Sequence, residues 1–296
     1  MKKLAKEIAR VGLIANVDKL SCRGPVRKAC RLIQGTGRSV LMDAPTAKLA
    51  GLDLDTRLNA AQLSGDVDLL IVFGGDGTML RVAREVAGSR TPMVGINAGG
   101  LGFLTDIQTH QLPLALRQIW AGQTQREARP LMEAQGQAGG RPFVQYALND
   151  FVVSRGAAPR LIELEVSVDN EVLTRYRCDG LIVCSPTGST AYSLAAGGAV
   201  VNPSAEVFSI TPICPHTLSN RSVIVSMKSE VRIRVLSDKV DTLLTADGQA
   251  TLPLQVRDCV VIRRGNRSVH LLHLAGSSFF ETLRRKLNWS GSSVGT

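Results

Sequence analysis

Residues 68–78 read Asp-Leu-Leu-Ile-Val-Phe-Gly-Gly-Asp-Gly-Thr, an apolar run that ends in a glycine-rich turn. A continuous run of this kind is typical of a strand buried on both faces of a parallel sheet. The residues that follow, 78–87, carry apolar side chains at helical spacing. The stretch therefore predicts a strand, a glycine loop and a helix, which together form the repeating unit of a parallel α/β fold.

The sequence on either side extends this pattern. Short apolar strands are predicted at residues 11–15, 39–42 and 92–96, and a further helix at residues 112–120. A weaker helical stretch after the first strand is expected to break near Gly24-Pro25. This alternation predicts a Rossmann-like α/β domain over residues 1–120.

From residue 121 the signals change to short, evenly spaced strands separated by turns. Asp169-Asn170 is a turn between two strands that form a predicted hairpin. Such spacing is typical of an all-β sandwich, so residues 121–276 are expected to form a β-rich, sandwich-like domain. Residues 277–296 are predicted to form a closing helix and a frayed Ser/Gly-rich tail. The strands predicted in this region include 161–168, 171–177, 181–184, 223–225, 231–235, 243–245, 259–262 and 269–272.

The glycine loop indicates phosphate chemistry. Gly75 and Gly77 lie between a buried strand and the start of a helix, where backbone N–H groups bind phosphate. A carboxylate there is repelled by phosphate unless it binds magnesium or accepts a proton from an attacking hydroxyl, which makes Asp76 the candidate catalytic group. The chain has no Walker A pattern, and Leu80 replaces the third glycine of the dinucleotide fingerprint. Taken alone, the motif is explained equally well as a tight turn capped by Asp76.

A second group of candidates follows the strand predicted at residues 181–184. Thr187, Thr190 and Tyr192 supply hydroxyl groups near an expected helix start, which suits a diphosphate or a ribose. The simpler explanation is a helix cap, with Tyr192 in the core.

Two further motifs have the chemistry of a nucleotide site. Asn149 beside Asp150 offers an amide and a carboxylate to the two hydroxyls of a ribose. The glycine-rich loop at residues 95–104 brings Phe103 to a position where its ring could contact a flat ligand. A turn and a flexible connection are the simpler explanations when each motif is taken alone.

Composition limits the partners. The formal net charge of +10 attracts polyanions, but the basic residues are spread along the chain and the few aromatic residues are not interleaved with them. We therefore expect no nucleic acid partner, and no membrane partner either, because no window approaches the roughly 18 apolar residues of a membrane-spanning helix. Six cysteines without a Cys-x-x-Cys pair, and no signal-peptide core, predict a cytoplasmic protein with reduced thiols and no zinc site.

Five segments taken together resemble the bacterial NAD kinase family. They are residues 74–78, 95–106, 147–150, 179–198 and 247–249. The first also looks like a motif of lipid kinases and phosphofructokinases, whereas the long segment from Asp179 to Gly198 is much more specific. The resemblance covers most of the chain, from the glycine loop near Gly74 to about residue 265. It implies an enzyme that transfers the terminal phosphate of ATP to the 2′-hydroxyl of the adenosine ribose of NAD, giving NADP, with NAD bound by the β-rich domain.

The resemblance also implies roles for single residues. The aspartate that matches Asp76 lies at the acceptor hydroxyl and is regarded in the family as the catalytic base. Gly75 and Gly77 belong to the same loop. The other residues expected to bind substrate are Phe103, Asn149, Asp150, Arg177, Asp179, Thr187, Thr190, Ala191, Tyr192, Asp247 and Gln249.

The family assembles and binds metal in ways that the resemblance carries over as expectations. The aspartate that matches Asp179 contacts dinucleotide bound at a neighbouring subunit, which implies a homo-oligomer, a dimer or a tetramer, with shared sites. The simpler explanation is that Asp179 pairs with Arg175 or Arg177. Magnesium is expected with ATP, and no metal ligands of the chain itself are identified.

The chain departs from the family at two positions, and two other functions fit parts of the same pattern. The family usually has Asn-Glu where this chain has Asn149-Asp150, and Gly100 stands where relatives often carry a larger polar residue. A lipid kinase of the same superfamily would need an apolar groove for acyl chains, and no long apolar surface is evident. A non-catalytic regulator would bind NAD without turnover. The sequence leaves open whether ATP or polyphosphate is the donor and whether NAD or NADH is the acceptor.

Overall fold

The computed structural model describes residues 8–105, 107–217, 220–238 and 240–289. The chain divides into two compact units, of which the first comprises residues 1–129 and 267–296 and the second residues 130–266. The expected tail at residues 290–296 lies outside the described residues, as does Asp106.

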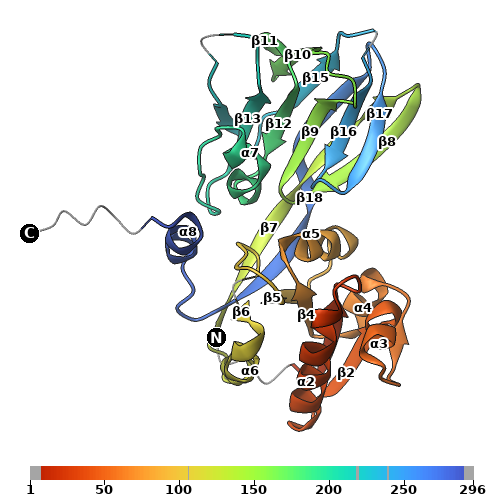
Figure 1. Ribbon diagram of the computed structural model, residues 1–296, viewed down its shortest axis with the longest axis vertical. Coiled ribbons are helices and arrows are strands. Elements are labelled where there is room, and N and C mark those ends of the chain that lie inside the picture. The colour runs from red at the N-terminus through yellow and green to blue at the C-terminus, as the bar shows by residue number, and fades with distance from the viewer. Residues whose placement is uncertain (1–7, 106, 218–219, 239, 290–296) are drawn as a thin grey trace, which may run out of the picture. The chain divides into compact units, whose positions relative to one another are not determined.

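A parallel sheet with the strand order β3-β2-β1-β4-β5 lies at the centre of the first unit. Its strands β2, β4 and β5 are labelled in Figure 1. Residues 69–73 of the apolar run lie in β4 (Leu69–Gly74), which is buried along its whole length. The strands of this sheet are β1 (Arg10–Ala15), β2 (Ser39–Asp43), β3 (Thr56–Arg57), β4 (Leu69–Gly74), β5 (Pro92–Asn97) and the short β6 (Ile107–Gln108).

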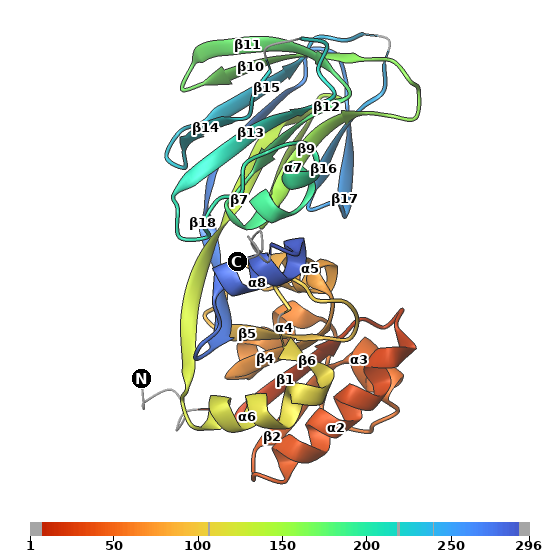
Figure 2. The same cartoon turned by 60° about the vertical axis from the view of Figure 1, so that its left-hand side comes forward.

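Helices cover both faces of this sheet. Helices α2, α3 and α6 lie on one face (Figure 2). Their buried side chains share one core with alternate residues of the strands, among them Leu13 and Phe73. On the other face, Leu63 of α4 lies against Gly12, and Met79 of α5 lies against Gly95. This two-sided burial explains why β4 is apolar throughout. The helices are α2 (Arg23–Gln34), α3 (Ala44–Ala50), α4 (Ala60–Asp66), α5 (Asp76–Glu85), α6 (Leu112–Trp120) and α8 (Phe279–Leu287), with 3₁₀ turns at Leu20–Cys22 and Thr109–Gln111.

The expected break near Gly24-Pro25 is wrong. Helix α2 begins at Arg23, so both residues lie in its first turn. Proline is tolerated there because the first N–H groups of a helix have no partner within it.

Of the helices in the described part of the chain, none is long and apolar enough to cross a membrane.

Two long strands, β7 (Thr124–Ala138) and β18 (Cys259–Leu274), continue from one unit into the other and pair with each other. The strands predicted at residues 259–262 and 269–272 are therefore two ends of β18. This strand pairs with β15 (Val231–Val235) at Ile262 and with β5 at His270. The units divide after residues 129 and 266, whereas the sequence predicted boundaries near residues 120 and 276. The start of β7 and the end of β18 therefore belong to the first unit. Helix α8 belongs to the first unit.

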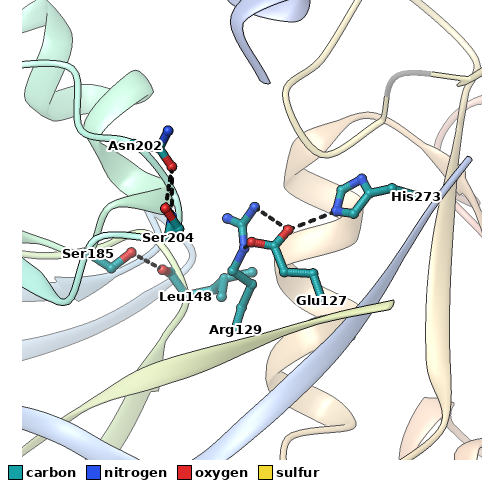
Figure 3. A network of polar contacts seen from close by, with 7 residues as sticks. All are labelled: Glu127, Arg129, Leu148, Ser185, Asn202, Ser204 and His273. Carbon is teal, nitrogen blue, oxygen red and sulfur yellow. Dashed lines mark hydrogen bonds and ion pairs between the residues drawn. The ribbon is translucent and has the colours of Figure 1, made fainter. Parts of the chain in front are cut away.

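A polar network links the two long strands within the first unit (Figure 3). The Glu127 carboxylate lies 2.7 Å from Arg129 Nε and 3.0 Å from His273 Nε2. Burial opposes ionisation here, but the bonds from His273 and Arg129 outweigh it and lower the pKa of Glu127 to about 2. The network ties the start of β7 to the end of β18.

The second unit is a sandwich of two sheets around one core. One sheet has the order β11-β10-β15-β18 and also includes β7 and β8, and the other has the order β14-β13-β12-β9-β16-β17. Side chains from both, such as Leu164 and Phe151, share the core. The predicted α/β unit and sandwich are thus confirmed. The bounds are β8 (Arg141–Ala147), β9 (Asp150–Arg155), β10 (Ile162–Val168), β11 (Glu171–Cys178), β12 (Gly180–Cys184), a 3₁₀ turn at Thr187–Thr190, α7 (Tyr192–Ala195), β13 (Val207–Ile213), β14 (Val223–Ser226), β15 (Val231–Val235), β16 (Thr242–Ala246) and β17 (Ala250–Leu254).

Candidate active site

In the first unit, Asp76 is the first residue of α5 and is held by the loop that follows β5. Its Oδ2 accepts a hydrogen bond from Phe103 N–H at 2.8 Å. Its Oδ1 accepts from Leu104 N–H and from the Thr105 hydroxyl, both at 3.0 Å. Three donors thus fix the orientation of a half-buried carboxylate beside Gly75 and Gly77.

Close contact between this loop and Asp76 requires a glycine at residue 102. A Cβ at that position would lie 2.7 Å from Asp76 Cγ and closer still to its Oδ1. Any larger residue at Gly102 would displace the carboxylate or the loop.

Asn97, at the end of β5, shapes the same loop. Its Nδ2 donates to Gly100 O at 2.6 Å and to Thr105 Oγ1 at 2.9 Å, and its Oδ1 accepts from Gly99 N–H at 2.6 Å. Neither Asn97 nor Thr105 was predicted from the sequence to be functional. The available signal was an asparagine at the end of a predicted strand, separated by Ala98 from Gly99-Gly100. Asparagine side chains often form hydrogen bonds with nearby backbone groups.

Phe103 itself is half-buried and contacts the C-terminal helix. Its ring centroid lies 6.4 Å from that of Phe279, and Lys286 Nζ lies 5.7 Å from the ring centroid. The ring is therefore packed against α8 in this structure, while its backbone N–H holds Asp76.

In the second unit, three segments meet around Asn149 and Asp150. Ser185 Oγ donates to Leu148 O at 2.6 Å (Figure 3), and Ser185 N–H donates to Asn149 O at 2.9 Å. Gly188 N–H donates to Ser185 Oγ at 3.3 Å. A Cβ at Gly188 would lie 2.5 Å from the carbonyl carbon of Asn149, so only glycine fits.

The third segment is the turn between β16 and β17. Asp247 Oδ1 accepts from the N–H groups of Asn149 at 2.7 Å and Asp150 at 3.3 Å, and its Oδ2 accepts from Leu148 N–H at 3.1 Å. Asp247 is buried. Gln249 is exposed beside it, and its N–H donates to Ala246 O at 3.0 Å.

Burial and charge act together on Asp150, which is only 4% exposed. Burial, and then the negative charge of Asp247, raise the pKa of Asp150 to about 7. Burial also raises the pKa of the neighbouring Cys184 thiol to about 11. Asp150 thus changes its charge near neutral pH, which an ordinary aspartate does not.

Asn149 carries an unused acceptor. Its Oδ1 is buried and has no hydrogen-bond partner among the residues that the structure describes. A buried amide oxygen without a partner costs free energy, so a donor from a ligand would stabilise it.

The hydroxyl-rich segment after β12 forms the 3₁₀ turn and α7. Thr187, Thr190 and Ala191 are half-buried, and Thr190 Oγ1 donates to Thr187 O at 3.4 Å. Tyr192 is 48% exposed, so the alternative that places it in the core is wrong. Its position after the tight turn directs it outward, while Ser193 beside it is buried.

Asp179 lies at the other end of β12 from this segment, because Gly180 pairs with Ser154 while Cys184 pairs with Asp150. Its Oδ1 is 2.6 Å from Arg155 Nε. The structure thus supplies a partner that was not predicted from the sequence. Arg175 pairs with Glu165, and Arg177 is exposed.

The candidate residues therefore fall into separate groups. Gly75, Asp76, Gly77 and Phe103 meet in the first unit. In the second, Asn149, Asp150, Asp247, Gln249 and the segment from Thr187 to Tyr192 gather at one end of β12 and β9, and Arg177 and Asp179 lie at the other. Among the described residues, no group of three or more His, Cys, Asp or Glu side chains is placed to hold a metal ion.

Comparison with known proteins covers nearly the whole chain. The ATP-NAD kinase N-terminal domain matches residues 11–124, and the ATP-NAD kinase C-terminal domain matches residues 148–274. The chain is 42% identical to an NAD kinase of Thiobacillus denitrificans, over 94% of this chain and 96% of the relative. It is 40% identical to an NAD kinase of Syntrophotalea carbinolica, over 95% of this chain and 98% of the relative.

Solved structures agree with this assignment. Yeast NADH kinase complexed with NADH has a TM-score of 0.86 at 25% identity and covers 98% of this chain and 90% of its own. An NAD kinase from Archaeoglobus fulgidus in complex with ATP shares the fold, with a TM-score of 0.75 at 24% identity over 95% of this chain and all of its own. The resemblance drawn from five sequence segments is confirmed, and the chain belongs to the ATP-NAD kinase family.

Proposed function

We propose that this chain transfers the terminal phosphate of ATP to the 2′-hydroxyl of the adenosine ribose of NAD, giving NADP. The observation that carries the proposal is the Asp76 carboxylate, oriented by three donors directly after a glycine loop and at the start of a helix. Phosphoryl transfer needs a positioned carboxylate of this kind and a backbone that accommodates phosphate.

Topology supports this location. Strand order reverses between β1 and β4, since β2 and β3 continue on one side and β5 on the other. In open parallel sheets, ligands bind at the carboxyl ends of the strands where the order reverses. Gly74, Gly75 and Asp76 lie at that end of β4.

In this mechanism Asp76 accepts the proton of the ribose hydroxyl as that oxygen attacks the terminal phosphorus. The bond from this phosphorus to the bridging oxygen breaks, and ADP leaves with that oxygen. The N–H groups of Phe103 and Leu104 and the Thr105 hydroxyl hold the carboxylate in the orientation it needs. The N-terminus of α5 favours the negative charge of the phosphates.

Asn149 and Asp150 are proposed to bind ribose hydroxyls. The unpaired Asn149 Oδ1 is a buried acceptor, which a hydroxyl donor would satisfy. The yeast structure of the same fold was solved with NADH, which supports a dinucleotide as the ligand of this site. The carboxylate of Asp150 is one methylene shorter than the glutamate usual in the family, so its partner would bind closer to β9.

Magnesium is proposed to enter with ATP. Mg²⁺ is commonly held by substrate phosphates, water and one or two carboxylates rather than by an all-protein cage. When bound, the ion offsets charge on the transferred phosphoryl group.

Assembly and location complete the proposal. The chain is proposed to form a dimer or tetramer in which Asp179 reaches dinucleotide held by the neighbouring subunit. The ion pair with Arg155 would orient Asp179 for that contact. Six free cysteines support a cytoplasmic location, where thiols stay reduced.

The deciding experiment incubates the chain with NAD, ATP and Mg²⁺ and measures NADP. Parallel reactions with NADH and with polyphosphate identify the acceptor and the donor. Flotation with liposomes tests the lipid kinase alternative. Binding of NAD without NADP formation would overturn the proposal in favour of a regulator.

A further inference from the structure

Three consecutive backbone N–H groups converge on one buried carboxylate in the second unit. Those of Leu148, Asn149 and Asp150 all donate to Asp247, at 2.7–3.3 Å. Both carboxylate oxygens are therefore engaged by the backbone, one by two donors and the other by one. A carboxylate that accepts several backbone N–H groups binds them more strongly than a neutral acceptor would.

The turn that carries Asp247 is itself anchored to the same loop. Asp247 and Gly248 have φ angles of 50° and 65°, the left-handed backbone of a tight hairpin turn. This turn brings Asp247 N–H within 3.0 Å of Asp150 O. Contact is thus reciprocal, because Asp247 both donates to and accepts from the residues it faces.

Ser185 holds the opposite, carbonyl side of the loop. Its hydroxyl and its N–H donate to the carbonyl groups of Leu148 and Asn149. With the N–H groups bound to Asp247 and the carbonyl groups bound to Ser185, the backbone at residues 148–150 has little freedom left. The Asn149 side chain, by contrast, keeps its unpaired Oδ1.

We propose that Asp247 is a positioning residue, whose carboxylate fixes the backbone of residues 148–150 before substrate arrives so that Asn149 and Asp150 meet the dinucleotide in a preformed arrangement. This gives Asp247 an indirect role in place of the substrate contact that the family resemblance implies. The identity of the substrate rests on the proposed function, whereas the preformed loop does not.

A preformed loop lowers the cost of ordering on binding, so losing it weakens binding rather than the chemical step. Asp247→Asn keeps the shape but replaces one acceptor oxygen with an N–H₂ group that faces backbone donors. We expect the KM for NAD to rise roughly 10- to 100-fold, as for a lost charge-assisted hydrogen bond. The KM for ATP and kcat should stay near their original values.

Asp258→Asn is the matched control. The Asp258 carboxylate also accepts two backbone N–H groups in the second unit, those of Gly139 at 2.9 Å and Gln255 at 2.7 Å. It contacts none of the candidate site residues in those bonds. This variant should lose some thermal stability and leave the KM for NAD unchanged. An equal rise in both variants, or a joint change in both KM values and kcat, would show that Asp247 is merely structural.

Charge provides a second readout. In the part of the chain that the structure describes, two titratable groups interact with Asp150: the Asp247 carboxylate from the turn and the neutral Cys184 thiol from β12. Removing the charge of Asp247 lowers the pKa of Asp150, so the midpoint of the pH dependence of the KM for NAD should move to lower pH in Asp247→Asn. It should not move in Asp258→Asn, and the dependence should vanish in Asp150→Asn. An unmoved midpoint in Asp247→Asn contradicts the proposal.

Amide hydrogen exchange on the unchanged full-length chain tests the loop without any variant. The amides of Leu148, Asn149 and Asp150 should exchange slowly without NAD, and adding NAD should slow them little further. Fast exchange that only NAD suppresses would overturn the preformed loop, even if the Asp247 variants failed to fold. Slow exchange in a chain that forms no NADP would instead overturn the proposed function alone.

Discussion

Replacing Gly188 with alanine should disturb the candidate site residues of the second unit without changing any charged group. The new Cβ would lie 2.5 Å from the carbonyl carbon and 2.8 Å from the Cα of Asn149. Carbon atoms that do not bond approach to about 3.5–4.0 Å, so one backbone segment must move by about 1 Å. Neither moves freely, because Ser185 links the two through Leu148 O, Asn149 O and Gly188 N–H.

The expected magnitude follows from that overlap. Overpacking of a well-packed region costs about 1–3 kcal/mol, and in a protein of this size each kcal/mol lowers Tm by about 2–4 °C. A displacement of about 1 Å at a binding site can reduce the rate by about 100-fold. We therefore expect kcat/KM for NAD to fall by roughly that factor, with a modest loss of Tm.

Steady-state kinetics and thermal unfolding of Gly188→Ala and Gly65→Ala provide the assay. Gly65 lies in α4, and a Cβ added there would meet no atom within 4 Å, so alanine should stabilise the helix by about 0.5–1 kcal/mol and leave activity unchanged. Normal kcat/KM for NAD in Gly188→Ala would refute the view that this close approach sets the geometry of residues 148–150.

Four further predictions concern chemistry, metal, pH and assembly. Asp76→Asn should lower kcat by about 100- to 10,000-fold while calorimetry shows NAD binding nearly intact, and near-normal turnover would exclude a catalytic base. EDTA should abolish NADP formation and added Mg²⁺ or Mn²⁺ should restore it, with no stoichiometric zinc by elemental analysis; activity that survives chelation contradicts the proposed chemistry. Folding raises the pKa of Asp150 from 3.8 to about 7, so the folded protein holds this proton more tightly than the unfolded chain. As the pH rises from about 4 to about 7, the free energy of unfolding should therefore fall relative to that of Asp150→Asn, by about 1.4 kcal/mol per unit of pKa shift, as measured by urea titrations. A difference between the two proteins that is constant with pH would show that the carboxyl titrates normally. Asp179→Ala should weaken NAD binding by roughly 1.5–3 kcal/mol, and mixing it with Asp76→Asn protein should restore part of the activity; confirmed mixed oligomers that stay inactive would make Asp179 a residue of its own chain's fold.

Local patterns were sufficient to predict the first unit. β4 and α5 follow from an apolar run, two glycines and helical spacing, because each is determined by neighbours in sequence. In the second unit, predicted strands match β10, β11, β12, β14, β15 and β16, whereas β8, β9, β13 and β17 are not among the predicted strands. β18 was divided in two because Arg263, Arg264 and Asn266 interrupt its apolar pattern where the strand is exposed between its pairings with β15 and β5.

The motifs of the site were visible in the sequence, but the contacts that hold them were not. Asp76 binds donors 27 to 29 residues away, and Asp247 binds N–H groups 97 to 99 residues away. No short-range pattern reports such pairings. Arg155 likewise contacts Asp179 only because of the register between β9 and β12. The sequence had suggested Arg175 or Arg177, which are closer to Asp179 along the chain.

The division of the chain has a consequence for its synthesis. Residues 130–266 form one unbroken unit, whereas the first unit needs β18, which is made after them. Residues Pro92 and Met93 of β5 therefore stay without their β18 partners, His270 and Leu271, until the ribosome has added the intervening residues. At 5–20 residues per second this takes roughly 10 to 35 seconds. During that interval the nascent chain presents an unpaired parallel edge, the kind of surface on which chaperones act. The second unit, residues 130–266, can therefore complete its fold before the first unit does, although the first unit begins earlier in the sequence.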